Sequence, residues 1–342
     1  MKLNFCTLFD TNYLTRGLVM YESLLKTCDD FHLYVFAFDD NSYHFLKAGN
    51  YAFMTIISLQ EFEDPDLLAI KSQRSAAEYC WTSTPSTIQY AIEKYKLANC
   101  TYIDADLYFY SNPGILIEEM GDKSVMITEH RYTKEYDRSE ISGKYCVQFM
   151  TFKADETGLK VLNWWRERCL EWCFARPENG KFGDQKYLDD WSVRFNGIYE
   201  LSNLGGGVAP WNIQQYEFRQ SDQGIIGTEK KTGAKFTTVF FHFHGLKFYE
   251  NDIVNLPYYR SSKQVFELFY KPYINLLKEN QIKIMSNNSF DPNGTAGRSV
   301  AQPMNFLLLV KFLLASLIYG FSFKKTISEY HYYKINQNGK LN

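Results

Sequence analysis

Two carboxylates in the triplet Asp104-Ala105-Asp106 are the residues best suited to chemistry in this sequence. They follow the short apolar segment 100–103 (CTYI) and precede another apolar segment, LYFY. Two acids one residue apart at the end of a strand can turn toward one divalent cation, and carboxylate oxygens suit Mg²⁺ or Mn²⁺. A D-x-D triplet alone is common on solvated turns, but acids between two apolar segments are unusual there. The triplet therefore predicts a metal site that can neutralise charge on a departing diphosphate.

A second group of residues, in the segment HFHGLK, carries two imidazoles and a lysine. His242 and His244 alternate with phenylalanines, so on a strand both imidazoles lie on the same face. Either one can complete a metal site with the two aspartates, and the sequence leaves both as candidates. Gly245 permits close backbone approach, and Lys247 is suited to a phosphate as a point charge.

The elements that must position these residues alternate between strand and helix patterns. Strands are predicted at 3–9, 31–38, 53–59 and 100–103, and helices at 16–27, 60–70 and 85–97, with Thr15 expected to cap the first helix. This alternation predicts an α/β fold with an open, mostly parallel sheet flanked by helices. Ligands of such sheets bind at the carboxyl ends of the strands, which is where the Asp triplet falls.

The second half of the chain is more mixed and ends in a polar segment followed by an apolar one. Strands are predicted at 124–128, 145–152 and 238–244, helices at 155–174, 183–193 and 262–283, and a linker at 286–303. Residues 304–321 form an apolar run interrupted only by Lys311, with Lys324 and Lys325 after it. Basic residues beside an apolar helix favour a membrane surface, contacted through 304–325. A helix docked on the catalytic core and a marginal spanning helix are the alternatives.

Composition narrows the classes of function. The 342-residue chain has a formal net charge of −2, which gives no electrostatic case for nucleic-acid binding. Its seven cysteines are scattered and include no CxxC pair, so a zinc ribbon or a redox dithiol is not expected. No signal-peptide pattern opens the chain. We therefore expect a cytoplasmic protein that is peripheral on the inner face of the plasma membrane.

Four motifs, taken in order, resemble a known family. The segments TLFDTNYLTRGLVMYESLL, YIDADLYFY, GDQKYLDDW and HFHGLK are similar to those of GT-A-fold glycosyltransferases, over roughly residues 1–250. The resemblance is strongest to family 8, which includes glycogenin and bacterial lipopolysaccharide galactosyl- and glucosyltransferases. It implies a Rossmann-like sheet, Mn²⁺ or Mg²⁺, and transfer of a hexose from a UDP-sugar with retention. The acceptor it implies is a saccharide or a lipid-linked acceptor, in bacterial cell-surface polysaccharide synthesis.

The same resemblance implies roles for individual residues. Metal binding is implied for Asp104, Asp106 and His242; nucleotide and diphosphate contacts for Thr7, Asp10, Tyr13, Arg74, Asp104, Asp106 and Lys247; and a place beside the transferred sugar for Asp184 and Gln185. The family's H-F-x-G-x-x-K-P-W pattern is only partly kept, since Lys247 comes one residue early. Gln148 stands where a middle strand of the family carries Asn-x-Gly, and it is the expected substitute in contacts with the donor sugar.

Several alternatives remain at this level. Asp184 is equally suited to cap a helix before Lys186, or to act as a general base if the protein supplies one. Trp211, in a Gly-rich segment, fits either a sugar-stacking residue or a turn. The expected organisation is a catalytic domain at 1–285, with a nucleotide half near 1–110 and an acceptor half near 111–285, then the linker and a tail at 304–342. A nucleotidyltransferase and an inactive carbohydrate-binding scaffold at a membrane are the rival functions.

Overall fold

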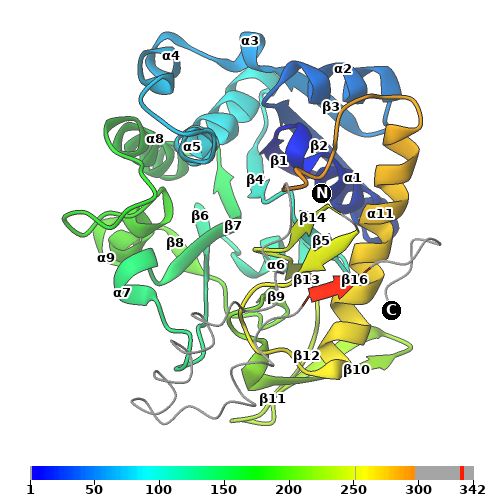
Figure 1. Ribbon diagram of the computed structural model, residues 1–342. Helices are drawn as coiled ribbons and strands as arrows, with labels where there is room; N and C mark the ends of the chain where they lie inside the picture. The colour runs from blue at the N-terminus through cyan, green and yellow to red at the C-terminus, as the bar shows by residue number, and fades with distance from the viewer. Residues whose placement is uncertain (1, 251, 297–331, 335–342) are drawn as a thin grey trace, which may run out of the picture.

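The fold is built around one twisted sheet, shown in the computed structural model of the chain (Figure 1), which describes residues 2–250, 252–296 and 332–334. The sheet has seven strands in the order β3-β2-β1-β4-β7-β6-β8. Only β7 runs against its neighbours β4 and β6; the other pairings are parallel. The predicted α/β fold with a mostly parallel sheet is therefore confirmed.

The strands of the central sheet are mostly short and apolar. They are β1 (Leu3–Phe9), β2 (Phe31–Ala37), β3 (Met54–Ser58), β4 (Asn99–Ile103), β6 (Val125–Glu129), β7 (Tyr145–Lys153) and β8 (Ile198–Glu200). Outside it lie β5 (Leu107–Phe109), β9 (Gly206–Val208), β10 (Tyr216–Ser221), β11 (Gly224–Glu229), β12 (Lys235–Thr237), β13 (Phe240–His242), β14 (Lys247–Tyr249), β15 (Ile253–Asn255) and β16 (Tyr332–Lys334). These nine strands form three small sheets, ordered β5-β13-β9, β10-β11-β12 and β14-β15-β16.

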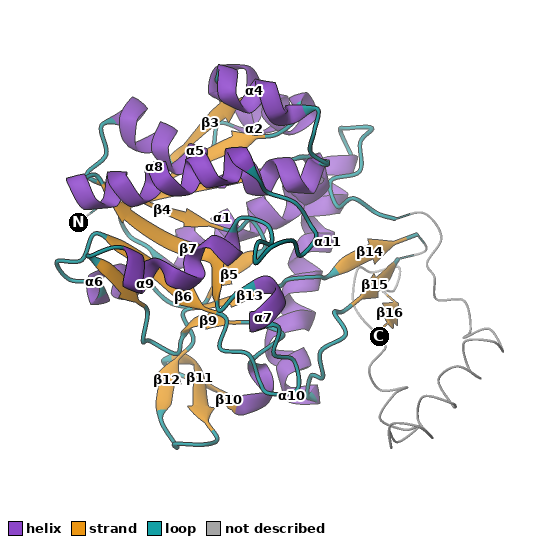
Figure 2. Cartoon of the chain, turned by 90° about the vertical axis from the view of Figure 1, so that its left-hand side faces the viewer, coloured by secondary structure: helices purple, strands orange, loops and turns teal. Residues whose placement is uncertain are grey.

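Helices cover both faces of the central sheet (Figure 2). They are α1 (Leu14–Thr27), α2 (Asp40–Gly49), α3 (Leu59–Phe62), α4 (Pro65–Lys71), α5 (Ala76–Tyr95), α6 (Gly114–Glu119), α7 (Ser139–Ser142), α8 (Glu156–Glu171), α9 (Trp191–Arg194), α10 (Lys263–Val265) and α11 (Lys271–Met285). Short 3-10 turns lie at Thr11–Tyr13, Gln185–Asp190 and Ile213–Gln215, and a π-helical turn at Phe266–Tyr270 joins α10 to α11.

Two apolar layers hold the sheet between the helices. Side chains of α5 and α8 pack on one face with Cys6, Phe36 and Phe152, and those of α1 pack on the other with Phe5 and Val35. Alternation along β1 and β2 supplies both layers, because successive side chains point to opposite faces. The carboxyl ends of the adjoining strands β1 and β4 lead into the segments that carry Asp10 and the Asp triplet.

The structure corrects several expected element boundaries. The region predicted as one helix at 60–70 is two, α3 and α4, because Asp64 caps a new helix that starts at Pro65. Helix α5 starts at Ala76 and not at 85, since Ser75 and Glu78 form a capping box. Thr15 lies inside α1 and does not cap it; its hydroxyl bonds to Asn293 instead.

The segment predicted as a linker is packed against the catalytic part over its described residues. Asn293 is buried, and the backbone amide of Thr15 donates to the carbonyl of Pro292 (3.3 Å). Ala296 pairs with β14 through its amide, 3.0 Å from the carbonyl of Phe248. The apolar run at 304–325 lies outside the described residues. Among the helices that are described, none has the length and apolarity needed to cross a lipid bilayer.

Candidate metal centre and its surroundings

Asp104, Asp106 and His242 come together from two segments far apart in the sequence. Asp104 directly follows β4, and Asp106 directly precedes β5. Strand β13 pairs antiparallel with β5, so that His242 lies opposite Leu107, and the amide of Phe243 donates to the carbonyl of Asp106 (2.9 Å). This register places the imidazole beside the two carboxylates.

The distances within this cluster suit a single divalent cation. His242 Nε2 lies 3.1 Å from Asp106 Oδ1 and 3.6 Å from Asp104 Oδ2. One ligand atom from each residue lies within 4.8 Å of the others. Adjacent ligands of an octahedral ion at about 2.1 Å are roughly 3 Å apart, so small adjustments would bring all three atoms onto one Mg²⁺ or Mn²⁺. The three residues therefore fit a metal centre, and among the two candidate histidines the geometry selects His242.

Gln148 fixes the orientation of the His242 ring. It lies in β7 at the position beside Asp104, whose amide donates to its carbonyl (3.0 Å). Its side-chain Oε1 is 2.7 Å from His242 Nδ1, and a carbonyl oxygen only accepts, so Nδ1 carries the proton. The lone pair of the neutral ring is then on Nε2, which faces the carboxylates, as a metal ligand requires.

This arrangement differs from the sequence-based expectation for Gln148. Its side chain is fully buried and bonded to His242, so the structure does not place it as a contact of the donor sugar. Gly207 makes room for it: φ is +118° there, and a Cβ would come within 3.4 Å of Gln148 Nε2. A polar residue in an otherwise apolar strand was the signal that this residue has a partner.

The charges of the cluster divide the two aspartates. Burial tends to raise the pKa of Asp106, but His242 outweighs it and lowers this pKa to about 2. Burial raises the pKa of Asp104 to about 6, with Asp106 adding to the rise and His242 opposing it. For His242, burial is outweighed by Asp106, which raises its pKa well above 6.5. In the absence of a metal the ring is therefore the cation of the cluster, and a metal ion would replace its proton.

Asp184 is a third acid nearby, in a different environment. It is buried and precedes the 3-10 turn at Gln185–Asp190 without capping it, so the capping interpretation is wrong. Its carbonyl accepts from Trp165 Nε1 (2.9 Å). Burial, and then the charge of Asp104, raises its pKa to about 8. Without a metal, this raised pKa favours the protonated form of Asp184 at neutral pH, in which the side chain can donate a hydrogen bond.

The turn after β1 lies next to the cluster. Asp10 shapes this turn, accepting from the amide of Asn12 (3.0 Å) and from its side-chain nitrogen (2.9 Å). Partial burial, followed by the charges of Asp106 and Asp104, raises the pKa of Tyr13 to about 12, and the residue as a whole is 41% exposed. Tyr13 therefore presents an accessible ring beside the carboxylates. Thr7, in contrast, is fully buried within β1.

Sequence reasoning missed Arg16, a buried cation in the first turn of α1. Its guanidinium donates to the carbonyls of Asn12 (3.2 Å), Asn293 (3.3 Å) and Leu246 (3.0 Å). It lies over the ring of Tyr13, at 4.5 Å from the centroid, and contributes to the low pKa of Asp106. Arg16 thus joins the β1 turn, the loop after β13 and the segment after α11. Nothing in the local pattern of α1 singled it out.

Three other predicted residues lie outside the cluster, and two of them have partners elsewhere. Arg74 donates to the carbonyl of Leu170 (3.2 Å) and lies 4.0 Å above the Phe174 ring, at the junction of α4, α5 and α8. Gln185 Nε2 donates to the carbonyl of Ser142 (2.6 Å), which holds α7 in place. Lys247 is exposed at the start of β14. Their proposed contacts with the diphosphate and the sugar remain predictions.

Trp211 is a buried residue and not an exposed platform. Its Nε1 donates to the carbonyl of His130 (2.8 Å), and its ring packs edge-on against His242 (5.3 Å) and His244 (5.5 Å). The Gly-rich segment 204–212 is therefore an ordered part of the core beneath the metal centre. His244 is exposed above Trp211, outside the three-residue cluster.

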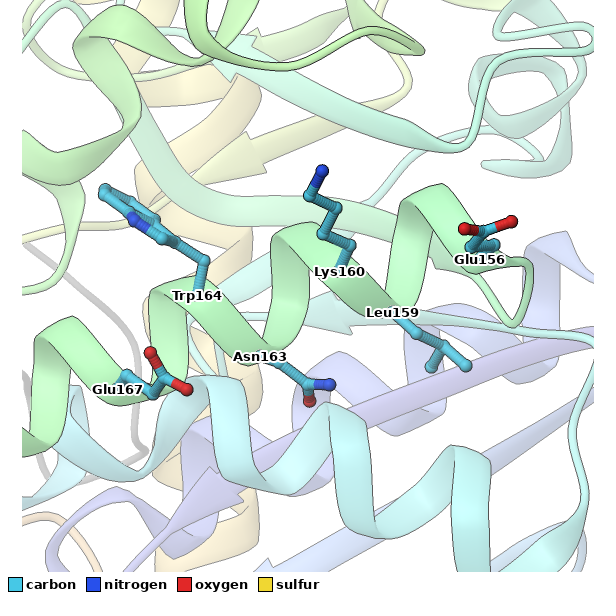
Figure 3. A pocket seen from close by; sticks show the side chains of 6 residues that line it. All are labelled: Glu156, Leu159, Lys160, Asn163, Trp164 and Glu167. Carbon is cyan, nitrogen blue, oxygen red and sulfur yellow. The ribbon is translucent and has the colours of Figure 1, made fainter.

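A shallow groove elsewhere on the surface does not belong to this site. It has a volume of about 560 Å³ and is lined by Glu156, Leu159, Lys160, Asn163, Trp164 and Glu167 (Figure 3). All six side chains project from α8, which packs on α5 and not on the small sheet that carries His242. The hollow on α8 is therefore separate from the metal centre.

Several solved glycosyltransferase structures are similar to the chain at low identity. Mouse xyloside xylosyltransferase 1 in its apo form matches 72% of this chain and 98% of its own, with 11% identity and a TM-score of 0.45. The glycosyltransferase GlyE of Streptococcus pneumoniae TIGR4 matches 60% of this chain and 47% of its own, with 13% identity and a TM-score of 0.39. Because these scores are low, the fold assignment rests on the strand order of the chain itself.

Two curated proteins of Bacillus subtilis (strain 168) are similar in sequence over most of their length. The uncharacterized protein YfnD is 31% identical over 284 residues, covering 80% of this chain and 88% of YfnD. The uncharacterized protein YfnF is 30% identical over 255 residues, covering 72% of this chain and 82% of YfnF. No family model matches the chain. Identity at this level over this length shows that the chain belongs to the family of YfnD and YfnF.

Proposed function

We propose that the protein is a metal-dependent glycosyltransferase that moves a hexose from a UDP-sugar to a saccharide or lipid-linked acceptor. The observation that carries the proposal is the Asp104–Asp106–His242 cluster at the carboxyl end of β4, with His242 oriented by Gln148. Two carboxylates, one half-buried and one buried, face a single imidazole, so the cluster keeps a net negative charge that a divalent cation would offset. A site of this kind at this edge of a parallel sheet suits a nucleotide diphosphate held through a divalent ion.

Each neighbouring residue has a role in this proposal. A divalent ion bound by the cluster would supply Lewis-acid stabilisation of the diphosphate leaving group. Tyr13 would stack on the uracil, since its accessible ring lies beside the carboxylates. Asp184, protonated at neutral pH, would donate a hydrogen bond to a hydroxyl of the donor sugar. The retention implied by the family 8 resemblance requires no dedicated general base, and the raised pKa of Asp184 agrees with this.

The location and the acceptor follow from the same proposal. The family 8 resemblance supports cell-surface polysaccharide synthesis in a bacterium, with Mn²⁺ or Mg²⁺ as the ion. Contact with the inner face of the plasma membrane through 304–325 is the expectation from the apolar run and its basic flank. The scaffold alternative is disfavoured by the intact cluster, and the nucleotidyltransferase alternative by the absence of a Gly- and basic-rich loop after β1.

Binding of UDP to the full chain, with and without Mn²⁺, tests the proposal by calorimetry. We expect UDP to bind only with the metal, and a screen of UDP-sugars to show slow metal-dependent hydrolysis of one of them. ADP serves as the control nucleotide, because a base-specific turn should discriminate against it. Absence of UDP binding with both Mn²⁺ and Mg²⁺ would contradict the proposal.

A further inference from the structure

A series of aromatic contacts leads from the metal centre to the surface. Trp211, which packs against His242, also lies 6.4 Å from the ring of Tyr259. Tyr259 is buried and stacks on Tyr258, with the ring centres 4.3 Å apart and the planes 25° apart. Tyr258 itself is 53% exposed. The exposed ring is therefore three ring contacts from a metal ligand.

Two buried tyrosines pack against the exposed ring of Tyr258. Tyr136, which is buried, packs edge-on against Tyr258 (6.1 Å) and Tyr259 (5.0 Å). The hydroxyl of Tyr258 donates to that of Tyr259 (3.4 Å). Loss of side-chain freedom is a main cost of binding, so an aromatic ring already held in place binds a ligand with little further ordering.

The backbone that carries Tyr258 is fastened as well. The amide of Arg260 donates to the hydroxyl of Tyr136 (3.0 Å), and its carbonyl accepts from Gln214 Nε2 (2.8 Å). The guanidinium of Arg260 pairs with Glu135. These contacts tie the loop after β15 to the segment after β6, which also contributes His130 under Trp211. The loop that carries Tyr258 and the core beneath the metal centre are therefore both held by the segment after β6.

We infer that Tyr258 is the platform on which the acceptor saccharide stacks, a role that rests on the proposed function. The apolar face of a pyranose fits a flat exposed ring, and tyrosine adds a hydroxyl for a hydrogen bond at its edge. Charges of both signs surround the ring: Arg260 is paired with Glu135, Asp137 and Arg138 have opposite signs, and the exposed Lys134 adds one positive charge. Most of these charges therefore cancel in neighbouring pairs, which suits a neutral sugar ring.

Saturation-transfer NMR on the full chain with UDP and diamagnetic Mg²⁺ tests this assignment. The probes are the methyl α- and β-glycosides of glucose, galactose and mannose. We expect at least one to receive saturation on the protons of its apolar face, and Tyr258→Ala to weaken its binding about tenfold, the effect of losing one aromatic contact. Tyr258→Phe, which keeps the ring, should retain binding within about twofold.

Phe53 provides a matched control at the other end of the parallel strands. It is 54% exposed and immediately precedes β3, so it lies at the amino end of that strand. The metal centre lies on the side of the carboxyl ends. Phe53→Ala should leave glycoside binding unchanged. No signal from any probe with the wild-type chain would overturn the inference, as would a signal that survives in Tyr258→Ala or is lost equally in Phe53→Ala.

Calorimetry separates this inference from the proposed function. Tyr258→Ala should bind UDP with Mn²⁺ as the wild type does, because the ring lies outside the Asp104–Asp106–His242 cluster. Glycoside binding at Tyr258 without any UDP binding would overturn the proposed donor and leave a carbohydrate-binding surface. UDP binding without any glycoside signal would overturn the acceptor platform alone.

Discussion

Two acidic regions lie close together in this protein and differ in what balances their charge. The Asp104–Asp106 pair faces a histidine, and this cation holds the pKa of Asp106 at about 2 after burial is overcome. Asp184 has no such partner, and burial with the charge of Asp104 raises its pKa to about 8. At neutral pH one region therefore offers ionised oxygens to a metal, while the other offers a proton to a ligand.

The difference shows that burial alone does not decide what a carboxyl group does. Asp104 and Asp106 lie at the carboxyl end of β4, Asp184 is close enough to feel the charge of Asp104, and the position of one imidazole separates their roles. That position depends in turn on Gln148, which lies in a neighbouring strand. The difference in pKa between Asp106 and Asp184 thus depends on strand register, and substitution of either an acid or a residue that orients His242 should change it.

The largest effect is expected from the ionised region. Asp106→Asn keeps the shape of the side chain but removes the negative charge that pairs with His242 or with a metal. We expect metal-dependent UDP binding to weaken by at least about 100-fold, or roughly 3 kcal/mol, in calorimetry. Asp122→Asn, an exposed acid in the turn after α6, is the control. Equal binding by Asp106→Asn and the wild type would remove the cluster from the donor site.

Loss of the orienting contact should have a smaller effect. Gln148→Leu removes the acceptor of the His242 Nδ1 proton, so the ring can turn and its tautomer is no longer fixed. We expect Mn²⁺ affinity to fall about 10–100-fold, the range typical of outer-shell partners of metal-bound histidines. Gln148→Glu keeps an acceptor at this position and should retain more affinity than Gln148→Leu. The opposite order would argue against the orienting role.

The raised pKa of Asp184 should make the stability of the folded chain depend on pH. Without metal, the folded chain keeps a proton on Asp184 up to about pH 8, whereas the unfolded chain releases it near about pH 3.9. Wild-type stability therefore falls relative to Asp184→Asn as the pH rises from about 4 to 8. We expect the variant to melt about 3 °C higher at pH 8, or about 1 kcal/mol. A difference in melting temperature that does not change with pH would mean that Asp184 is ionised in the fold.

The smallest effect is expected at the second histidine. His244 is exposed and lies outside the cluster, so His244→Gln should change Mn²⁺ affinity by less than about threefold, or roughly 0.7 kcal/mol. The matched variant His242→Gln should lose metal binding as Asp106→Asn does. Titration of Mn²⁺ by its paramagnetic signal distinguishes the two. Equal losses in both variants would make the pair, and not His242 alone, the ligand.

The first half of the fold was more predictable than the second. Its strands β1, β2 and β3 are apolar runs that are neighbours both in the sequence and in the sheet, and β4 adds to the other side of β1. The Asp triplet directly follows β4. The local pattern of residues was therefore enough to predict the strands and the triplet. The partners of the triplet depend on contacts between distant strands. The choice between His242 and His244, the burial of Gln148 and the place of Arg16 all follow from the pairing of β13 with β5 and β9. No local pattern contains that register.

The segment after α11 bears on how the protein can be shortened. Asn293 bonds to Thr15 and Arg16, and a Cβ at Gly294 would come within 2.8 Å of Asn12, so this segment packs closely against the turn that carries Tyr13. A chain cut at residue 285, the expected end of the catalytic domain, would expose the guanidinium of Arg16 and loosen the turn next to the carboxylates. A version without the apolar tail should therefore keep Ala296, where the segment's backbone contacts with β14 are complete, although it would lose the pairing of β16 with β15.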